Sequence, residues 1–333
     1  MLFRSRNTKE EMEKAKAIRK TLDTEMELGT MGGAYKMEEV EETLDKLYTK
    51  YGSKKLITQK FSIGKSHEGR DIYVVKISDH ADKDEGDKES QVLYTALTHA
   101  REPGGMMTLF YFMYYLLENY EKGDQRVRNI VENRELYFIP VANPDGYAYN
   151  QKNKPNGGGM HRKNRNGSGI DLNRNFGPQE LWNYPNSGSS TSSSSDTYRG
   201  TAAFSEKETQ VLRDFSLTKN FKTALNYHTY SNLLIYPWGI KNEVADPFFK
   251  TMAIEMTRIN GYRHGTAQGL LYAVRGVADD YFYKERGVFS MTPEAGGYSD
   301  GFWPTASRYW ALAKENLEAN LLLAEYAAQV PSK

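Results

Sequence analysis

The chain has 333 residues, of which 39% are hydrophobic, and this is enough apolar content to bury a sizeable core. Its 44 Lys and Arg residues nearly balance its 43 Asp and Glu residues, so the formal net charge is only +1. This balance argues against a partner held by bulk charge, and we expect neither a nucleic acid nor a membrane as partner. Cysteine is absent, which excludes disulfides and thiolate metal sites and leaves the redox compartment open.

The first 34 residues differ in composition from the rest of the chain. Residues 1–30 are helix-prone and rich in charge of both signs, and they end at a group of glycines. The mixed signs favour a helix docked on the surface, although a mobile arm or the remnant of a pro-segment stays open. We therefore predict a charged helical extension over residues 1–34. The first ten residues lack an apolar core followed by a cleavage site, so no secretory signal is expected in this sequence.

From Tyr35 onward, strand-like segments alternate with helix-like segments. Strands are predicted at residues 72–77, 92–98, 136–141, 223–230, 233–236 and 288–292. Helices are predicted at residues 37–51, 103–120, 205–219, 246–260, 277–285 and 306–328. Residues 150–169 and 186–196 are rich in Asn, Gly and Ser and are predicted to be loops. This alternation indicates one α/β domain over residues 35–333 with a mostly parallel sheet.

Two histidines and one glutamate stand where predicted strands end. His99 follows the run 92–98, His228 lies in the run 223–230, and Glu102 precedes Pro103 at a helix entrance. Open α/β sheets place their ligands at the carboxyl ends of strands. Two imidazoles and one carboxylate fill three positions of a tetrahedral Zn²⁺ site and leave the fourth to water, as in catalytic sites. A lone histidine is more often an ordinary residue, so the evidence lies in the set of three.

Seven short segments, taken in order, resemble the signature of zinc metallocarboxypeptidases of the carboxypeptidase A/B family. They are His99-Ala-Arg-Glu102, Asn-Pro-Asp-Gly146-Tyr, His161-Arg-Lys-Asn-Arg165, Asp171-Leu-Asn-Arg174-Asn-Phe, His228-Thr-Tyr230, Tyr272 and Thr-Pro-Glu294. The match runs from about Tyr35 to Leu323. It implies a mixed, mostly parallel, eight-stranded twisted sheet with helices on both faces. It also implies one Zn²⁺ per chain, held by His99, Glu102 and His228, and removal of the C-terminal residue of a peptide or protein.

The resemblance also assigns roles in the chemistry. Glu294 matches the general base, which takes a proton from water and returns it to the leaving amine. Its alternative reading is a carboxylate that caps the turn at Gly296. Arg162 matches the arginine that stabilises the oxyanion. Asp171 matches the aspartate that supports the first histidine, the alternative being a loop residue that accepts from nearby backbone amides.

Further matches concern substrate binding. Arg174, with Asn173 beside it, matches the clamp for the terminal carboxylate, a duty that suits the planar fork of arginine. Tyr272 matches the mobile tyrosine that closes over the substrate. Arg101 and Arg165 resemble secondary subsite contacts, and Tyr230 is also expected to bind substrate. For the arginines, the alternative reading is a solvated basic loop.

Asp279 falls where the family's side-chain pocket carries an aspartate in members that prefer Lys or Arg and an apolar residue in the others. A carboxylate in a narrow pocket is unfavourable unless a cation compensates for its lost hydration, so we predict a preference for basic C-terminal residues. Two alternatives stay open. Asp279 could merely suit the start of a helix, or Arg275 could neutralise it, and the specificity would then be broad or hydrophobic.

Three features depart from the family pattern. The loop 186–196 lacks the disulfide of animal secreted members and is expected to be mobile. No full inhibitory pro-domain precedes Tyr35, and the segment after Glu294 is one residue shorter before Phe302. Two other functions were weighed, a catalytically silent peptide-binding protein and an amidase acting on cell-wall peptides. The resemblance favours an extracellular or periplasmic monomer.

Overall fold

The computed structural model describes residues 10, 13, 24–86, 88–185, 188–240 and 244–331. The helical extension predicted at the N-terminus falls largely outside these residues. Where residues 24–34 are described, they form two isolated β bridges, Gly29–Gly33 and Met31–Ala34, instead of a helix. Gly33 has a φ of +96°, a conformation that a helix does not contain. The helical prediction is therefore wrong for this part of the extension.

The central sheet has eight strands in the order β1-β2-β4-β3-β5-β8-β6-β7. The strands are β1 (Phe61–Lys65), β2 (Asp71–Ile77), β3 (Ser90–Thr95), β4 (Arg134–Ile139), β5 (Phe221–Asn226), β6 (Leu233–Tyr236), β7 (Arg263–Thr266) and β8 (Phe289–Glu294). The inner strands β4, β3, β5 and β8 are mutually parallel, whereas β1, β2 and β6 introduce antiparallel pairs. The predicted α/β domain with a mixed, mostly parallel, eight-stranded sheet is confirmed.

The longer described helices are α2 (Met37–Tyr51), α3 (Pro103–Lys122), α4 (Gln125–Val131), α5 (Pro144–Asn153), α7 (Lys207–Leu217), α8 (Pro247–Met256), α10 (Ala278–Arg286) and α11 (Arg308–Tyr326). The short helices α6 (Gln179–Trp182) and α9 (Ala267–Leu270) lie near the rim of the sheet. Helix α5 overlaps the start of the predicted loop 150–169, so that boundary was wrong. No helix in the described part of the chain is long and apolar enough to span a bilayer.

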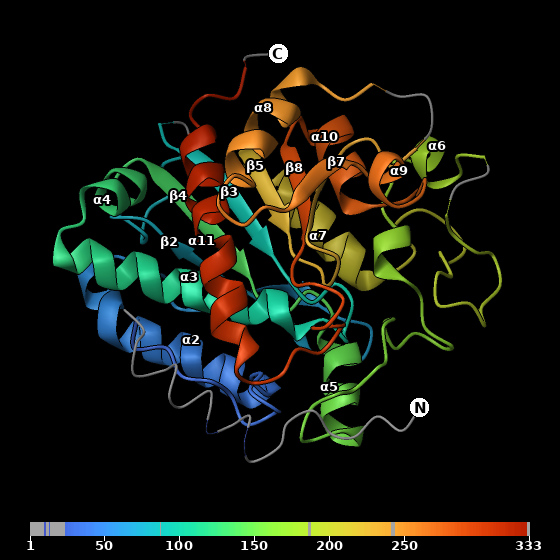
Figure 1. The fold of residues 1–333 in the computed structure, drawn as a ribbon, viewed down its shortest axis with the longest axis horizontal. Helices are drawn as coiled ribbons and strands as arrows, with labels where there is room; N and C mark the ends of the chain where they lie inside the picture. Colours follow the sequence, from blue (N-terminus) through green and yellow to red (C-terminus); the bar gives the residue numbers. More distant parts are fainter. Residues whose placement is uncertain are drawn as a thin grey trace.

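Helices cover both faces of the sheet (Figure 1). One hydrophobic core packs α2, α3, α4, α8 and α11 against side chains such as Tyr94 and Phe138. The second core packs α7 and α10 against the opposite face, through residues such as Leu93 and Tyr137. Neighbouring residues of β3 and β4 thus point to opposite faces, as the period of a strand requires. A sheet buried on both sides explains why its inner strands read as continuous apolar runs.

Glu89, just before β3, gives a test of the fold's pH dependence. Burial and the nearby carboxylates of Asp79, Glu85 and Glu135 raise the pKa of Glu89 to about 7. An acid whose pKa is raised on folding contributes stability below its unfolded pKa of about 4.3 and loses it as the pH rises through its folded pKa. We expect Glu89→Gln to raise the melting temperature at pH 8 and to change it less at pH 5. Equal shifts at both pH values, measured by calorimetry, would contradict this assignment.

Candidate active site

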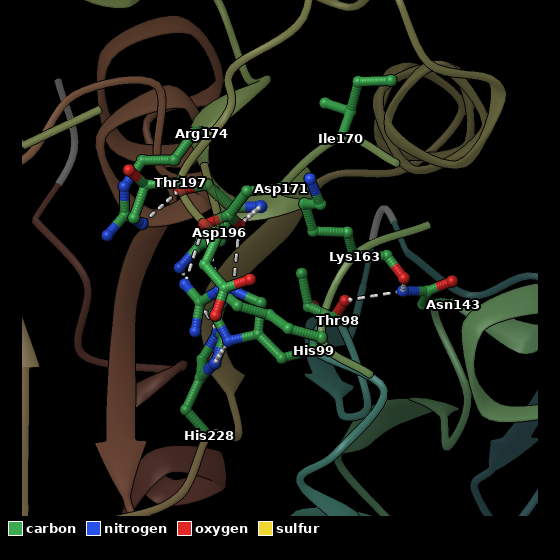
Figure 2. A network of polar contacts seen from close by, with 12 residues as sticks. Thr98, His99, Asn143, Lys163, Ile170, Asp171, Arg174, Asp196, Thr197 and His228 are labelled. Carbon is green, nitrogen blue, oxygen red and sulfur yellow. Dashed lines mark hydrogen bonds and ion pairs between the residues drawn. The ribbon is translucent and has the colours of Figure 1, made fainter. Parts of the chain in front are cut away.

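The three candidate metal ligands meet at one edge of the sheet, beyond the carboxyl ends of β3 and β5. Figure 2 shows His99 beside His228 and Asp171. Strand β3 ends at Thr95, earlier than predicted, because Leu97 adopts a left-handed backbone (φ 54°) and turns the chain towards His99. Glu102 is the residue before α3, whose first residue is Pro103, as the sequence indicated. His228 lies two residues beyond the end of β5 at Asn226. All three side chains are buried.

The donor atoms of these residues suit a single divalent cation. His99 Nδ1 lies 3.0 Å from Glu102 Oε1, and His228 Nδ1 lies 2.9 Å from Glu102 Oε2. The two Nδ1 atoms face each other at 2.9 Å. His99 Nε2 is 3.0 Å from Asp171 Oδ1, and a proton held there leaves the lone pair on Nδ1. Two nitrogens and a carboxylate converging in a buried space form the ligand set that Zn²⁺ prefers in catalytic sites.

One other group of described residues brings possible metal donors within 4.8 Å of one another. It consists of Asp79, His80 and Glu85, which lie at the surface, with the His80 side chain 46% exposed. Exposed acidic groups are common without a metal, whereas the His99 set is buried and is supported by Asp171. The buried set is therefore the candidate zinc site.

Asp171 and Arg162 form the layer behind the ligands. Arg162 donates from Nε and Nη2 to Asp171 Oδ2, at 3.1 and 2.8 Å, and its Nη1 lies 3.7 Å from Glu102 Oε1. Burial alone would raise the pKa of Asp171, but Arg162 and His99 outweigh it and hold that pKa well below its ordinary value. Asp171 is thus an anion that orients His99. It also accepts from Asn173 N, so the alternative reading as a local loop contact is also true.

Glu294 is the last residue of β8 and lies beside the ligand His228. Their segments are joined by two backbone hydrogen bonds of 2.9 Å, from His228 N to Pro293 O and from Ala295 N to His228 O. Burial, with a further contribution from the Glu102 carboxylate, raises the pKa of Glu294 to about 7, against the opposing effect of His228. A cation at the neighbouring ligands would favour the ionised form, which is the form a proton acceptor needs.

A pocket opens next to Glu294 and contains four of the predicted substrate-binding residues, but not Arg101 or Tyr230. Its lining includes Asn173, Arg174, Tyr272, Asp279 and Glu294. Arg174 Nη2 donates to the Tyr272 hydroxyl at 3.2 Å, while Arg174 Nε donates to the carbonyl of Gly188 at 2.8 Å. Tyr272 is 53% exposed and sits at the mouth of the pocket.

The carboxylate of Asp279 lies in the pocket wall and is held by three neutral donors. Asn226 Nδ2 and Ser290 Oγ donate to Oδ1 at 2.7 and 2.6 Å, and Thr292 Oγ1 donates to Oδ2 at 2.7 Å. Burial raises the pKa of Asp279. Arg275 does not neutralise it, because that side chain donates to Ser189 Oγ and to a backbone carbonyl. Asp279 does stand in the first turn of α10, so the helix-start reading agrees with the structure as well.

Arg101 and Tyr230 lie on the other side of the ligands, around Phe302. The Arg101 guanidinium stacks on the Phe302 ring at 3.8 Å, and the Tyr230 and Phe302 ring centroids are 5.1 Å apart. Arg101 Nη1 also lies 3.6 Å from the carboxylate of Asp196, which belongs to the loop expected to be mobile. That loop is fastened, since Lys163 Nζ donates to two of its carbonyls. Lys163 therefore anchors the described part of this loop.

Two contributors to the pocket were missed in the sequence. Asp280 lines it beside Asp279 and accepts from Gly239 N at 3.0 Å. Thr292, two residues before Glu294 on β8, points to the same side and holds Asp279. The period of a strand places Thr292 and Glu294 on one face, and this pattern could have revealed the contact.

Fold and site together define the class, which is a metal-dependent peptide hydrolase of the metallocarboxypeptidase type. The family model described as zinc carboxypeptidase matches residues 40–319. The chain therefore belongs to the zinc carboxypeptidase family, whose cofactor is Zn²⁺.

Several curated proteins and solved structures are similar to the chain. Carboxypeptidase B of Astacus astacus is 30% identical over 265 residues, which cover 75% of this chain and 82% of that protein. Zinc carboxypeptidase A 1 of Drosophila melanogaster is also 30% identical, over 78% of this chain, and the match spans 63% of its own length. The solved carboxypeptidase A of Helicoverpa armigera has a TM-score of 0.78 at 26% identity, covering 98% of this chain and 82% of that one.

Proposed function

We propose that the chain is a zinc-dependent exopeptidase that removes basic residues from peptide C-termini, with Glu294 as its general base. The observation that carries this proposal is the convergence of His99, Glu102 and His228 beside Glu294, next to a pocket that contains a carboxylate. When bound, zinc polarises the scissile carbonyl and lowers the pKa of a water molecule in the open position.

The side chains around the ligands divide the remaining work. Glu294 takes the proton from the attacking water and returns it to the amine that leaves. Arg162, whose side chain is only 11% exposed and is fixed by Asp171, presents positive charge where negative charge develops on the attacked carbonyl oxygen. Asp171 and the protein interior hold His99 in place, so the ligand geometry need not reorganise during the reaction.

The pocket accounts for exopeptidase selectivity in this proposal. Arg174 and Asn173 line its entrance, and a guanidinium fork matches the two oxygens of a terminal carboxylate. The Tyr272 hydroxyl accepts from Arg174 Nη2, and the residue is exposed, so it can follow a substrate into the site. A peptide without a free C-terminus offers no carboxylate to this clamp. Binding such a peptide would leave the Arg174 guanidinium without an anionic partner from the substrate.

The preference for Lys or Arg is supported by two carboxylates in the pocket wall, Asp279 and Asp280. The donors that hold Asp279 are neutral, so its charge is left for an incoming ammonium or guanidinium group. Relatives named carboxypeptidase A and carboxypeptidase B are similarly close in sequence, so sequence similarity does not decide the specificity and the proposal rests on the pocket residues.

The specificity can be tested with blocked peptides that end in Arg, Lys, Phe or Leu. We expect kcat/KM to favour Arg over Phe, and Asp279→Asn to reduce that ratio by about 10²-fold. Breaking a buried charge pair costs about 2–5 kcal/mol, and asparagine keeps the shape while removing the charge. Asp280→Asn is the matched variant. A wild-type preference for Phe, or a larger loss of the Arg preference in Asp280→Asn, would overturn the assignment to Asp279.

A silent peptide-binding protein would be expected to lack a ligand or the general base, and all four side chains are present. An amidase for acidic side-chain links would want cations where Asp279 stands. An extracellular or periplasmic location and a monomeric state stay predictions from the family resemblance.

A further inference from the structure

The backbone of Gly296, two residues beyond Glu294, is hydrogen-bonded at both its carbonyl and its N–H. Its carbonyl accepts hydrogen bonds from Ser231 N at 2.8 Å and Asn232 N at 2.9 Å. Its N–H donates to the Tyr262 hydroxyl at 3.1 Å. The first two donors belong to the segment that follows the ligand His228, so these bonds tie the chain beyond the base to the chain beyond the ligand.

Tyr262 is placed to act as a fixed support. The residue is 5% exposed and immediately precedes β7. Its hydroxyl also accepts from Asn316 Nδ2 at 3.3 Å, and the same amide donates to Leu312 O at 2.9 Å within α11. The hydroxyl is therefore fixed by a hydrogen bond from α11, a long helix of the core. Its contact with Gly296 restrains the backbone just beyond the end of β8.

The segment needs such a support because Gly296 has no side chain of its own to pack. Its φ is +91°, in the region that glycine tolerates best, and a Cβ there would approach Asp300 and Leu312 at 3.2 Å. Upstream, backbone bonds between His228 and residues 293–295 set the register of the two strands. At Gly296 N, the described partner is the Tyr262 side chain, which adds a restraint to the two backbone bonds that Gly296 O accepts.

We propose that Tyr262 is a positioning residue that holds Glu294 at its working distance from the ligand His228. The inference rests on the proposed role of Glu294 as general base. Because Tyr262 lies behind the segment and lines no part of the substrate pocket described above, its removal should affect the rate of the chemical step more than substrate binding.

The test compares Tyr262→Phe with Tyr94→Phe. Tyr94 is also fully buried, and its hydroxyl donates to Asn320 O on the same helix α11, but it makes no contact with the segment after Glu294. For Tyr262→Phe we expect kcat to fall by about tenfold, with KM and zinc content within about twofold of wild type. For Tyr94→Phe we expect kcat to stay near the wild-type value. Equal kcat values in the two variants would overturn the proposal.

A double-mutant cycle separates this inference from the proposed function. If Tyr262 acts through Glu294, adding Tyr262→Phe to Glu294→Gln should lower kcat no further. A full additional tenfold loss would show that Tyr262 acts by another route and would refute the inference. Normal turnover by Glu294→Gln alone would instead refute the general base, and this result is read from the single variant.

Discussion

Replacing Glu294 by Gln is expected to lower kcat by about 10³–10⁴-fold while KM for a peptide ending in Arg changes little. Glutamine keeps the size of the side chain but cannot take a proton from water, and general acid–base groups contribute about 10²–10⁴-fold. The contacts assigned to ground-state binding, at Arg174 and Asp279, are separate side chains in the same pocket. Steady-state kinetics at saturating and limiting substrate give the two parameters separately.

The control for this variant is Glu118→Gln on α3. Glu118 is likewise a buried glutamate whose pKa is raised by burial. It accepts from Glu25 N and lies near the opposite end of α3 from Glu102. Its replacement should leave kcat near the wild-type value. If Glu294→Gln turns over peptide as fast as this control, Glu294 is not the proton acceptor.

Removal of zinc is the second change with a large expected effect. A chelator should reduce turnover to below about one thousandth of the starting rate. Bound zinc would polarise the scissile carbonyl and activate the attacking water, and both effects are lost when it is removed. Stability should fall as well, because an ion bound by the folded state alone stabilises it by about 2.7 kcal/mol at 100 times its Kd. For a chain of 333 residues we expect the melting temperature to drop by about 4 °C.

The stability effect has a local cause. The Nδ1 atoms of His99 and His228 face each other beside the Glu102 carboxylate. A bound cation would offset the repulsion between the lone pairs on these two nitrogens. Added Mg²⁺ should not restore activity, because nitrogen ligands suit zinc and magnesium prefers oxygen. Full activity in chelator, or equal rescue by Mg²⁺, would contradict a nitrogen-ligated catalytic metal.

The inner strands were accessible from sequence because burial on both faces gives continuous apolar runs, and these runs placed His99 and His228 at strand ends. Most of the longer helices were also predicted, but α4 and α5 were not. The edge strands β1 and β7 were missed. Their residues are mostly exposed or half-buried, so they lack the apolar pattern that identifies a strand. Helix α5 was partly assigned to a loop because its last residues are polar, and polar residues are typical of both helix ends and loops.

Within the site, the order of the motifs along the chain predicted the metal ligands, the general base Glu294 and the carboxylate clamp at Arg174. It could not show how Asp279 is held, because its partners Asn226, Ser290 and Thr292 come from two strands that meet only in the folded sheet. The support that Tyr262 gives to Gly296 is equally hidden, since it joins a loop, a strand end and α11. Contacts of this kind follow from tertiary packing, and no local pattern encodes them.

Titration of the metal-free chain with Zn²⁺, with metal content and peptide hydrolysis measured on the same samples, tests the zinc site most directly. Hydrolysis should rise in proportion to bound zinc and level off at one ion per chain, and Glu294→Gln should bind the same one ion without turning over. A chain carrying both His99→Ala and His228→Ala that still loads one zinc and hydrolyses peptide at the wild-type rate would contradict the assignment of these ligands.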